Sequence, residues 1–564
     1  SSERPPKPKL PSRHEAVKSD RWKKAYRREI VKINEEAVMI GLSQTPSGKY
    51  IRPANAIVMK LLAIMEWKWR VDPDTDVEGW LECVRIVCDG SADKREGENT
   101  YAETPDRTLL FLMISIEATL GIKSKIGDAV RAYLNAPSLD KNLVVIADEM
   151  MTSGEGMERF DRESLLLKAL YGSIKGAISF QVWADMKLAE INYLKCDVAR
   201  GVYIKTIEDE VVRLYRHSDD FKISTSNNKH LDEEVEALQG KIRTTPFKPL
   251  SEFLGCTFAR FDSKTMVKDE TGDIQIVTMI SHIEKMEKDY GHLRKHMNPT
   301  GRVRHTPFPL KPVLCDHEMT ELQKQLIPEQ DIKEYMSMVM SVQWVVQNVR
   351  PNLRFCHHVL AKRMSNPRVW DVYLSVWLLE HMILTKNWPL VLGGSVVDPE
   401  VHTDASFASM EERRSICGHT LRSGDKSGVV RSEVRTLKVA VTSVFEAENM
   451  GASDGMDTEM YANRVVDELQ YPSLCSRKVY VDNTAAIDWM LGSVPSKRSK
   501  HMEVRLFRSR HLVARGDICM EYVPTKFNIA DLLTKSLPRQ DYERLSKMML
   551  GHELIAPDLR YWEI

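Results

Sequence analysis

The stretch VVRLYRHSDDFKISTS, residues 211–226, places two adjacent carboxylates at a tight turn between two apolar runs. Its pattern predicts a strand, a turn and a second strand, with Asp219 and Asp220 at the turn. Adjacent carboxylates repel each other, and a divalent metal is the usual compensation. The alternative is a solvated turn, where acidic residues are common because they hydrogen-bond to nearby backbone. Spacing alone leaves both interpretations open.

A third acid stands at the end of another predicted strand. In KIGDAVRAYLNA, residues 125–136, Asp128 ends the strand and precedes a helix. Phosphoryl transfer by two metals about 3.5–4 Å apart needs two or three carboxylates that converge from different strands. Asp128, Asp219 and Asp220 are therefore candidates for one metal site.

Length and composition bound the class of protein. The chain has 564 residues, which predicts two to four domains, and its 43% hydrophobic and 28% charged residues are typical of globular proteins. Nine cysteines without repeated spacing form no disulfide framework, so a reducing compartment is the simpler interpretation. The apolar run 109–116 is too short for a membrane span. A net charge of +0 argues weakly against a nucleic-acid binder, but catalytic carboxylates can balance basic patches.

Two shifts in composition predict domain boundaries. The first is the basic, Pro-containing stretch 292–312, and the second is Gly393-Gly394-Ser395, ahead of an expected strand at Val396 and Val397. Between them, apolar residues spaced by three and four over 332–349 predict a buried helix that stops at Arg350-Pro351. Residues 396–535 alternate strands and helices, as in a small α/β domain.

Seven segments together resemble copia-type reverse transcriptases. DAVRAYLNA (128–136), LLLKALYGSIKGA (165–177) and YRHSDD (215–220) resemble the successive palm motifs of that family in order and spacing. Four further segments also resemble parts of that family. EAVKSDRWKKAYRREI (15–30) resembles its opening helix, and CVRIV (83–87) resembles its fingers strand. EFLGCTF (252–258) resembles its primer-side Leu-Gly turn, and NVRPNLRFCHHVLA (348–361) resembles its Arg-Pro helix after the thumb.

The second half of the chain resembles a ribonuclease H domain of the same copia type. That chemistry hydrolyses the RNA of a hybrid with two metals held on four scattered acids. The matching acids lie in VHTDASF, VFEAEN, VYVDNTAAI and FNIADLLTK, and are Asp404, Glu446, Asp482 and Asp531. The resemblance covers about residues 14–545.

The resemblance implies a multidomain fold of α+β and α/β units, with a right-hand polymerase followed by a ribonuclease H-like α/β domain. Fingers and palm would occupy 1–260, thumb and connection 261–394, ribonuclease H 395–545, and a C-terminal tail 546–564. The implied activities are RNA-directed DNA polymerisation and hydrolysis of RNA in hybrids. Two Mg²⁺ ions per active site, with Mn²⁺ as the alternative, would be held by seven acids: Asp128, Asp219, Asp220, Asp404, Glu446, Asp482 and Asp531.

The resemblance also implies substrate-binding residues. Arg85 would meet the incoming triphosphate, Lys175 and Gly176 would line the nucleotide pocket, and Tyr133 would exclude the 2′-hydroxyl of a ribonucleotide. The alternative for Tyr133 is a core aromatic. The basic stretch 496–517 would track hybrid phosphates through Arg505 and Arg508, with His501 assisting product release; the alternatives are a solvated helix face and a structural histidine.

Implied partners are template RNA, an RNA/DNA hybrid, a primer such as a tRNA, and deoxynucleoside triphosphates, with a second copy or an integrase as protein partner and no membrane. The implied location is cytoplasmic, within virus-like particles, with nuclear entry.

Three positions depart from the family pattern. His217 and Ser218 stand where the family has Tyr and Val, and Cys83 stands in place of a fingers Lys. The alternative function is a catalytically reduced, domesticated retroelement protein that acts as a nucleic-acid-binding scaffold. The presence of all seven acids favours the enzyme.

Overall fold

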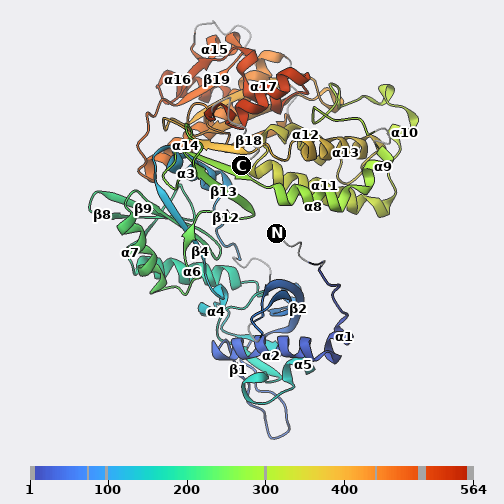
Figure 1. The fold of residues 1–564 in the computed structure, drawn as a ribbon, viewed down its shortest axis with the longest axis vertical. Helices are drawn as coiled ribbons and strands as arrows, with labels where there is room; N and C mark the ends of the chain where they lie inside the picture. The colour runs from blue at the N-terminus through green and yellow to red at the C-terminus, as the bar shows by residue number, and fades with distance from the viewer. Residues whose placement is uncertain are drawn as a thin grey trace.

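The computed structural model describes residues 5, 7–72, 75–93, 95, 100–297, 301–438, 441, 443–492 and 504–555. Within these residues, four β-sheets organise the chain. We call them, in chain order, the N-terminal, hairpin, middle and C-terminal sheets. Figure 1 places the N-terminal sheet at one end of the molecule and the C-terminal sheet at the other, with the hairpin sheet between them.

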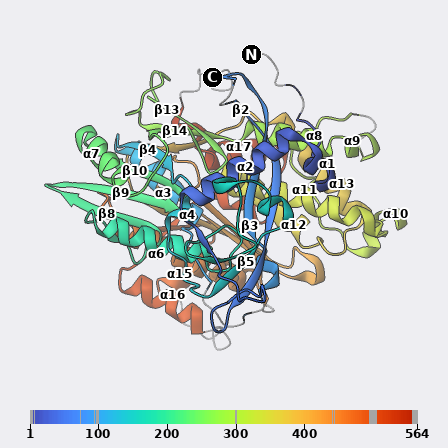
Figure 2. The same ribbon diagram turned by 90° about the horizontal axis from the view of Figure 1, so that it is seen from below.

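The N-terminal sheet has the strand order β1-β6-β5-β2-β3. Helix α2 lies across the long β2–β3 hairpin (Figure 2), because one face of the helix buries Trp22, Tyr26 and Ile30 in a core of its own. The elements of this region are α1 (Arg13–Lys18), α2 (Asp20–Glu35), β1 (Met39–Gly41), β2 (Ile57–Val71), β3 (Glu78–Cys88), β5 (Leu143–Ile146), α5 (Glu149–Thr152) and β6 (Glu163–Leu166).

The hairpin sheet has the order β11-β4-β10-β9-β8-β7. It confirms the strand–turn–strand prediction for 211–226 and the strand that ends at Asp128. Its elements are α3 (Arg107–Thr119), β4 (Lys123–Asp128), α4 (Ala132–Asn135), α6 (Gly176–Ala189), β7 (Leu194–Lys195), β8 (Val202–Ile207), β9 (Glu210–His217), β10 (Asp220–Thr225), α7 (Asn228–Gln239) and β11 (Lys248–Pro249).

The middle region combines the sheet β12-β13-β14-β15 with a group of helices, drawn at the right of Figure 1. Its elements are β12 (Glu252–Phe253), β13 (Cys256–Phe261), β14 (Ile274–Thr278), α8 (Ile280–Tyr290), α9 (His292–Met297), α10 (Glu321–Lys324), α11 (Glu329–Asn348), α12 (Arg354–Ala361), α13 (Val369–Leu384) and β15 (Leu390–Gly393). Helix α11 confirms the helix predicted over 332–349.

The strand predicted at Val396 and Val397 is wrong. Strand β15 ends at Gly393, and the next strand begins at Glu400. Gly393 and Gly394 follow the end of a strand and do not precede the start of one, and both have a positive φ, 117° and 135°, which glycine adopts without strain. Strand β13 spans residue 260 and pairs with β14, so the middle sheet contains residues from both sides of that position.

The C-terminal sheet has the order β18-β17-β16-β19-β20, with β16 parallel to β19 and β19 parallel to β20. It confirms a small α/β domain. Its elements are β16 (Glu400–Ser406), β17 (Ile416–Arg422), β18 (Arg431–Thr436), α14 (Val444–Glu468), β19 (Lys478–Val481), α15 (Thr484–Met490), α16 (Val504–Ala514), β20 (Cys519–Tyr522), the 3-10 helix η7 (Ile529–Leu533) and α17 (Arg539–Met549). Among the described residues, no helix has both the length and the apolar content to cross a membrane.

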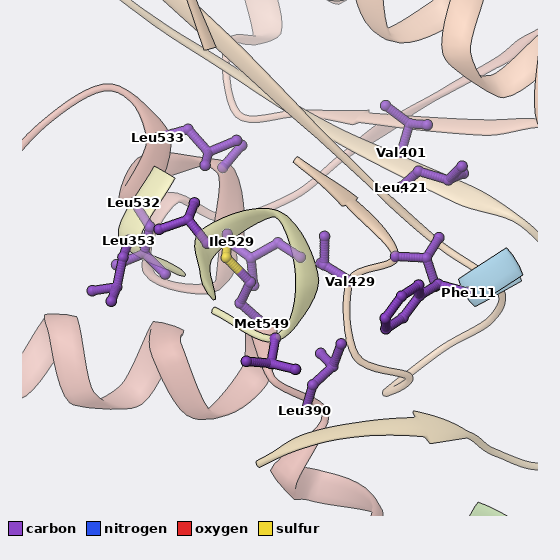
Figure 3. Close-up of a cluster of buried hydrophobic side chains, with 14 of the residues drawn as sticks. Phe111, Leu353, Leu390, Val401, Leu421, Val429, Ile529, Leu532, Leu533 and Met549 are labelled. Atoms are coloured by element: carbon purple, nitrogen blue, oxygen red, sulfur yellow. The ribbon is translucent and has the colours of Figure 1, made fainter. Parts of the chain in front are cut away.

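One hydrophobic core joins the hairpin, middle and C-terminal regions. It includes Phe111 of α3, Leu390 of β15 and Val401 of β16, which lie together in Figure 3. Burial of this size is the main favourable term in folding. The C-terminal domain is therefore packed into the rest of the chain and is not held by a linker alone.

Buried polar contacts cross the same interface. The Glu117 carboxylate of α3 accepts hydrogen bonds from Lys222 and Ser224 of β10, both at 2.5 Å, and from Tyr471 after α14, at 3.0 Å. The Arg213 guanidinium of β9 donates to the Leu469 carbonyl at 2.7 Å. Buried polar groups that satisfy one another specify a single arrangement. These contacts fix the hairpin sheet against helix α14.

Candidate active sites

The turn between β9 and β10 brings together the three predicted acids of the hairpin sheet. Asp220 stands directly opposite Asp128 in the antiparallel pairing of β10 and β4. The Asp219 carbonyl accepts a hydrogen bond from the Ala129 amide at 2.7 Å, which ties the turn to the end of β4. Ser218 has a φ of 58°, in the left-handed region that a non-glycine residue rarely adopts. The backbone thus holds the three carboxylates at one edge of the sheet.

The proximity of the three acids shifts the pKa of the Asp220 carboxyl. Burial, a hydrogen bond with Asp128 and the charges of Asp219 and Asp128 raise the pKa of Asp220 to about 7. A divalent cation stabilises the charged forms of such a group, and carboxylate oxygens are the ligands that Mg²⁺ prefers. The three acids therefore fit a metal, although their spacing is looser than that of the C-terminal acids described below.

An aromatic and cationic column stands beside these acids. The Arg85 guanidinium lies 5.0 Å from the ring centroid of Tyr171, and Tyr133 stacks on the same ring at 4.6 Å. Burial raises the pKa of Tyr171 most, and the nearby charge of Asp219 raises it further. Arg85 and Tyr133, both predicted from sequence, thus meet through Tyr171, which sequence reasoning did not single out.

A cavity of about 230 Å³ opens beside the column, lined by Cys83, Arg85, Arg131 and Tyr171 among others. Lys175 is not among the lining residues, because its ammonium forms an ion pair with the buried Asp140 at 3.4 Å. Gly176 begins α6 under the Tyr133 ring, where an added Cβ would lie 3.6 Å from a ring carbon. Of the predicted pocket residues, the structure brings Arg85, but not Lys175, to the cavity.

A second acidic cluster lies in the C-terminal domain. Asp404 is on β16, Glu448 on α14 and Asp482 directly after β19. One donor oxygen from each lies within 4.8 Å of the others, and no other group of three potential metal ligands is this close within the described residues. Asp531 of η7 faces the same cluster, since its charge acts on Glu448.

The prediction of Glu446 as the helical acid of this cluster is wrong. Glu446 lies in the first turn of α14, and the structure places Glu448 beside Asp404 and Asp482. Two residues along an α-helix are about 200° apart around its axis, so the two carboxylates leave the helix on nearly opposite sides. The segment VFEAEN contains two acids, Glu446 and Glu448, and the sequence of this segment alone does not show which of them faces the cluster.

The face of α14 that carries Glu448 is marked by two glycines. Gly451 and Gly455 follow Glu448 by three and seven residues and so share its face. A Cβ on Gly455 would lie 2.5 Å from a Thr403 side-chain carbon, and one on Gly451 would lie 3.3 Å from the Cys417 Cβ. These glycines let the helix approach the sheet closely enough for Glu448 to reach Asp404. This spacing is the signal that could have identified Glu448 from the sequence.

Burial and mutual repulsion shift the pKa values of these acids. The pKa of Glu448 rises to about 9 through burial and the charges of Asp404 and Asp482. Burial and the charge of Asp404 raise the pKa of Asp531 to about 7. The Oε2 atom of Glu448 is buried and has no hydrogen-bond partner. An unsatisfied buried carboxylate oxygen among other acids fits a divalent metal ligand.

The basic stretch is partly described. The described part of its helix, α16, packs on the C-terminal domain: Arg508 pairs with Asp457 of α14 at 2.6 Å, and Arg510 lies 5.1 Å from the Trp489 ring centroid. His501 lies outside the described residues, as does the side chain of Arg505.

Without divalent metal, thermal stability is expected to fall as pH rises from about 5 to about 9. The folded-state pKa values of Glu448, Asp220 and Asp531 exceed their ordinary values, so over this range the folded state holds more protons than the unfolded state. Stability is then lost as pH rises. In EDTA at pH 8, Glu448→Gln should raise the Tm by about 3 °C or more, measured by calorimetry. Glu446→Gln is the matched control, and an equal rise in both variants would contradict the assignment.

The chain is similar in sequence to several retrotransposon polyproteins. The chain is 22% identical over 496 residues to the retrovirus-related Pol polyprotein from transposon TNT 1-94 of Nicotiana tabacum, covering 86% of this chain and 35% of that protein. It is 22% identical over 483 residues to the corresponding polyprotein from transposon RE2 of Arabidopsis thaliana, covering 83% and 31%. A Ty1-NL2 Gag-Pol polyprotein of Saccharomyces cerevisiae matches 47% of the chain at 23% identity and is covered over 15% of its length. The chain thus spans about a third of the length of the first two relatives. No protein-family model matches.

Two solved structures of a foamy viral protease-reverse transcriptase are similar in outline. The complex with dsDNA matches at 12% identity with a TM-score of 0.46, covering 90% of this chain and 84% of that chain. The dRH form in complex with dsDNA matches at 11% identity with a TM-score of 0.41, covering 89% and 69%.

Proposed function

Because the chain is related to the Pol polyproteins of copia- and Ty1-type retrotransposons, we propose that it is an RNA-directed DNA polymerase with a fused ribonuclease H. The observation that carries the proposal is the convergence of three acids at one hairpin and four acids in a separate α/β domain of the same chain. Both are arrangements that two-metal phosphoryl transfer requires.

At the hairpin site, Asp128, Asp219 and Asp220 would hold two Mg²⁺ ions, with Mn²⁺ as a substitute. Bound metal would lower the pKa of the primer 3′-hydroxyl and neutralise charge on the leaving pyrophosphate. Arg85, at the cavity beside Tyr171, would bind the triphosphate of the incoming deoxynucleotide. The neutral Cys83 next to it would make triphosphate binding weaker than a second cation would.

In the C-terminal domain, Asp404, Glu448, Asp482 and Asp531 would hold the metal that activates water for hydrolysis of the RNA strand. The exposed Arg508 on α16 would bind hybrid phosphates together with the rest of the basic stretch. The ligands proposed for the whole chain are template RNA, a primer such as a tRNA, the hybrid and deoxynucleoside triphosphates, and the proposed setting is a cytoplasmic virus-like particle.

Primer extension tests the proposal. The full chain is incubated with a DNA primer on an RNA template, the four deoxynucleoside triphosphates and Mg²⁺. We expect extended DNA and shortened RNA, both abolished by EDTA. Binding of the hybrid without either reaction would instead support the alternative of a catalytically reduced scaffold. That alternative rests on His217, Ser218 and Cys83, where the sequence departs from the family pattern.

Tyr133 is expected to select deoxyribose. Its ring is half-buried, stacks on Tyr171 and lies 6.1 Å from the Phe180 ring, so it cannot shift without repacking its neighbours. A fixed ring under the incoming sugar would occupy the volume of a 2′-hydroxyl. Tyr133→Val should raise the relative use of ribonucleotides at least tenfold, or roughly 1.4 kcal/mol. The measurement is the ratio of kcat/KM for a ribonucleotide and its deoxy counterpart.

Tyr133→Phe is the matched variant, because it keeps the ring and removes only the hydroxyl. It should retain the wild-type ratio. If Tyr133→Val also retains it, Tyr133 is a core aromatic and not a gate.

A further inference from the structure

Lys535 places an ammonium group inside the acidic cluster of the C-terminal domain. Its Nζ lies 3.1 Å from an Asp531 oxygen and 3.7 Å from Asp404 Oδ2. The two carboxylates are buried, with side chains 6% and 3% exposed, whereas the Lys535 side chain is 39% exposed. The lysine therefore reaches in from the surface and bridges two acids that are themselves shielded from water.

The bridge divides the cluster into two halves that share Asp404. On one side, Asp404, Glu448 and Asp482 have donor oxygens within 4.8 Å of one another. On the other side, Asp404 and Asp531 face the Lys535 ammonium, and the Thr534 hydroxyl donates a hydrogen bond to Asp404 Oδ2, the oxygen that also pairs with Lys535. Two-metal sites hold ions about 3.5–4 Å apart, which is close enough for one carboxylate to contact both ions. In this cluster Asp404 is the residue placed to be that shared ligand.

We propose that Lys535 is a built-in competitor for the second divalent ion of the C-terminal site. The first ion binds Asp404, Glu448 and Asp482, and a second ion binds between Asp404 and Asp531 only by displacing the Lys535 ammonium. This inference rests on the assignment of these acids to metal binding in the proposed function.

Charge and flexibility support the competition. Two cations in one partly desolvated site repel strongly, because the interaction energy grows as the effective dielectric constant falls. The lysine stem is four carbons long and flexible, and its exposure allows the ammonium to move into water when it is displaced. While it is bound, the ammonium offsets the repulsion between Asp404 and Asp531, the two carboxylates that it contacts.

The test counts bound Mn²⁺ in the full chain, in a background that removes the hairpin site (Asp219→Asn with Asp220→Asn). Calorimetry and electron paramagnetic resonance give the affinity of each ion. In this background we expect one tightly bound ion and a weak second ion. With Lys535→Met the second ion should bind at least tenfold more tightly, and the spectrum of two coupled Mn²⁺ ions should appear at correspondingly lower Mn²⁺ concentration.

Two variants control for charge and for packing. Lys547→Met removes an exposed lysine of the same domain and should leave both affinities unchanged, whereas Lys535→Arg keeps a cation at the bridge and should keep the second ion weak. Lys535→Gln repeats the test with a polar side chain should Lys535→Met fold poorly. A second-ion affinity within threefold of the background value in both neutral variants would overturn the proposal and leave Lys535 as an ordinary ion pair. A chain that cleaves no hybrid but shows the predicted Mn²⁺ shift would instead contradict only the proposed function.

Discussion

Asp219→Asn is expected to abolish primer extension while hybrid cleavage survives. Asp219 stands at the turn beside Asp128 and Asp220, so the substitution removes a carboxylate that we propose binds metal, and it changes the shape of the side chain little. We expect the rate of DNA synthesis to fall by roughly three orders of magnitude, or about 4 kcal/mol of transition-state stabilisation. The measurement is single-turnover extension of a labelled primer, with hydrolysis of a preformed hybrid followed in parallel.

Asp209→Asn is the matched control, because Asp209 is an exposed acid at the β8–β9 turn, which lies at the opposite end of β9 from Asp219. It should leave both rates unchanged. If the Asp219→Asn variant extends primers at the wild-type rate, the assignment of the hairpin acids to catalysis is wrong.

Glu448→Gln should have the opposite selectivity. Glu448 is buried among Asp404, Asp482 and Asp531, and its substitution leaves the hairpin acids untouched. Hybrid cleavage should fall by roughly three orders of magnitude while primer extension stays near the wild-type rate. The measurement is release of labelled RNA fragments from a preformed hybrid.

Glu446→Gln, two residues away on the same helix, distinguishes the two acids of the segment VFEAEN. The geometry of α14 predicts that this variant cleaves hybrids at nearly the wild-type rate. Loss of cleavage in Glu446→Gln with retention in Glu448→Gln would reverse the assignment and restore the interpretation made from sequence.

The local sequence pattern is sufficient to predict the helices and strands that hold the sites. The alternation around Asp219 predicted β9 and β10, and the spacing of apolar residues over 332–349 predicted α11, because both patterns are set by residues close in the chain. The strand expected at 396–397 does not form, because a strand also needs a pairing partner. Strand β14 pairs with β15 only as far as Gly393 and β16 begins at Glu400, so Val396 and Val397 lie in neither strand.

Features that depend on distant partners could not be predicted. Lys175 was expected in the nucleotide pocket, but the buried Asp140 holds it elsewhere, and nothing in the local sequence indicates that pairing. The motif VFEAEN locates the segment but contains two acids, and only packing against the sheet shows that Glu448 is on the face toward Asp404. The sequence shows that Lys535 can pair with Asp531, four residues before it in the chain. It does not show the contact with Asp404, which lies 131 positions away, and that contact places Lys535 inside the cluster.

Two separate metal sites should act on one duplex, because the regions that hold them share one buried core. The buried contacts of Glu117, Arg213 and Tyr471 fix the hairpin sheet against α14, so the span between the two sites should be constant. The measurement uses a primer labelled in one colour on an RNA template labelled in another, extended one nucleotide at a time by supplying single deoxynucleotides. We expect each added nucleotide to move the RNA cuts by one position, at a constant distance from the primer end. Cuts that stay in place while the primer grows, or a primer that does not grow, would contradict it.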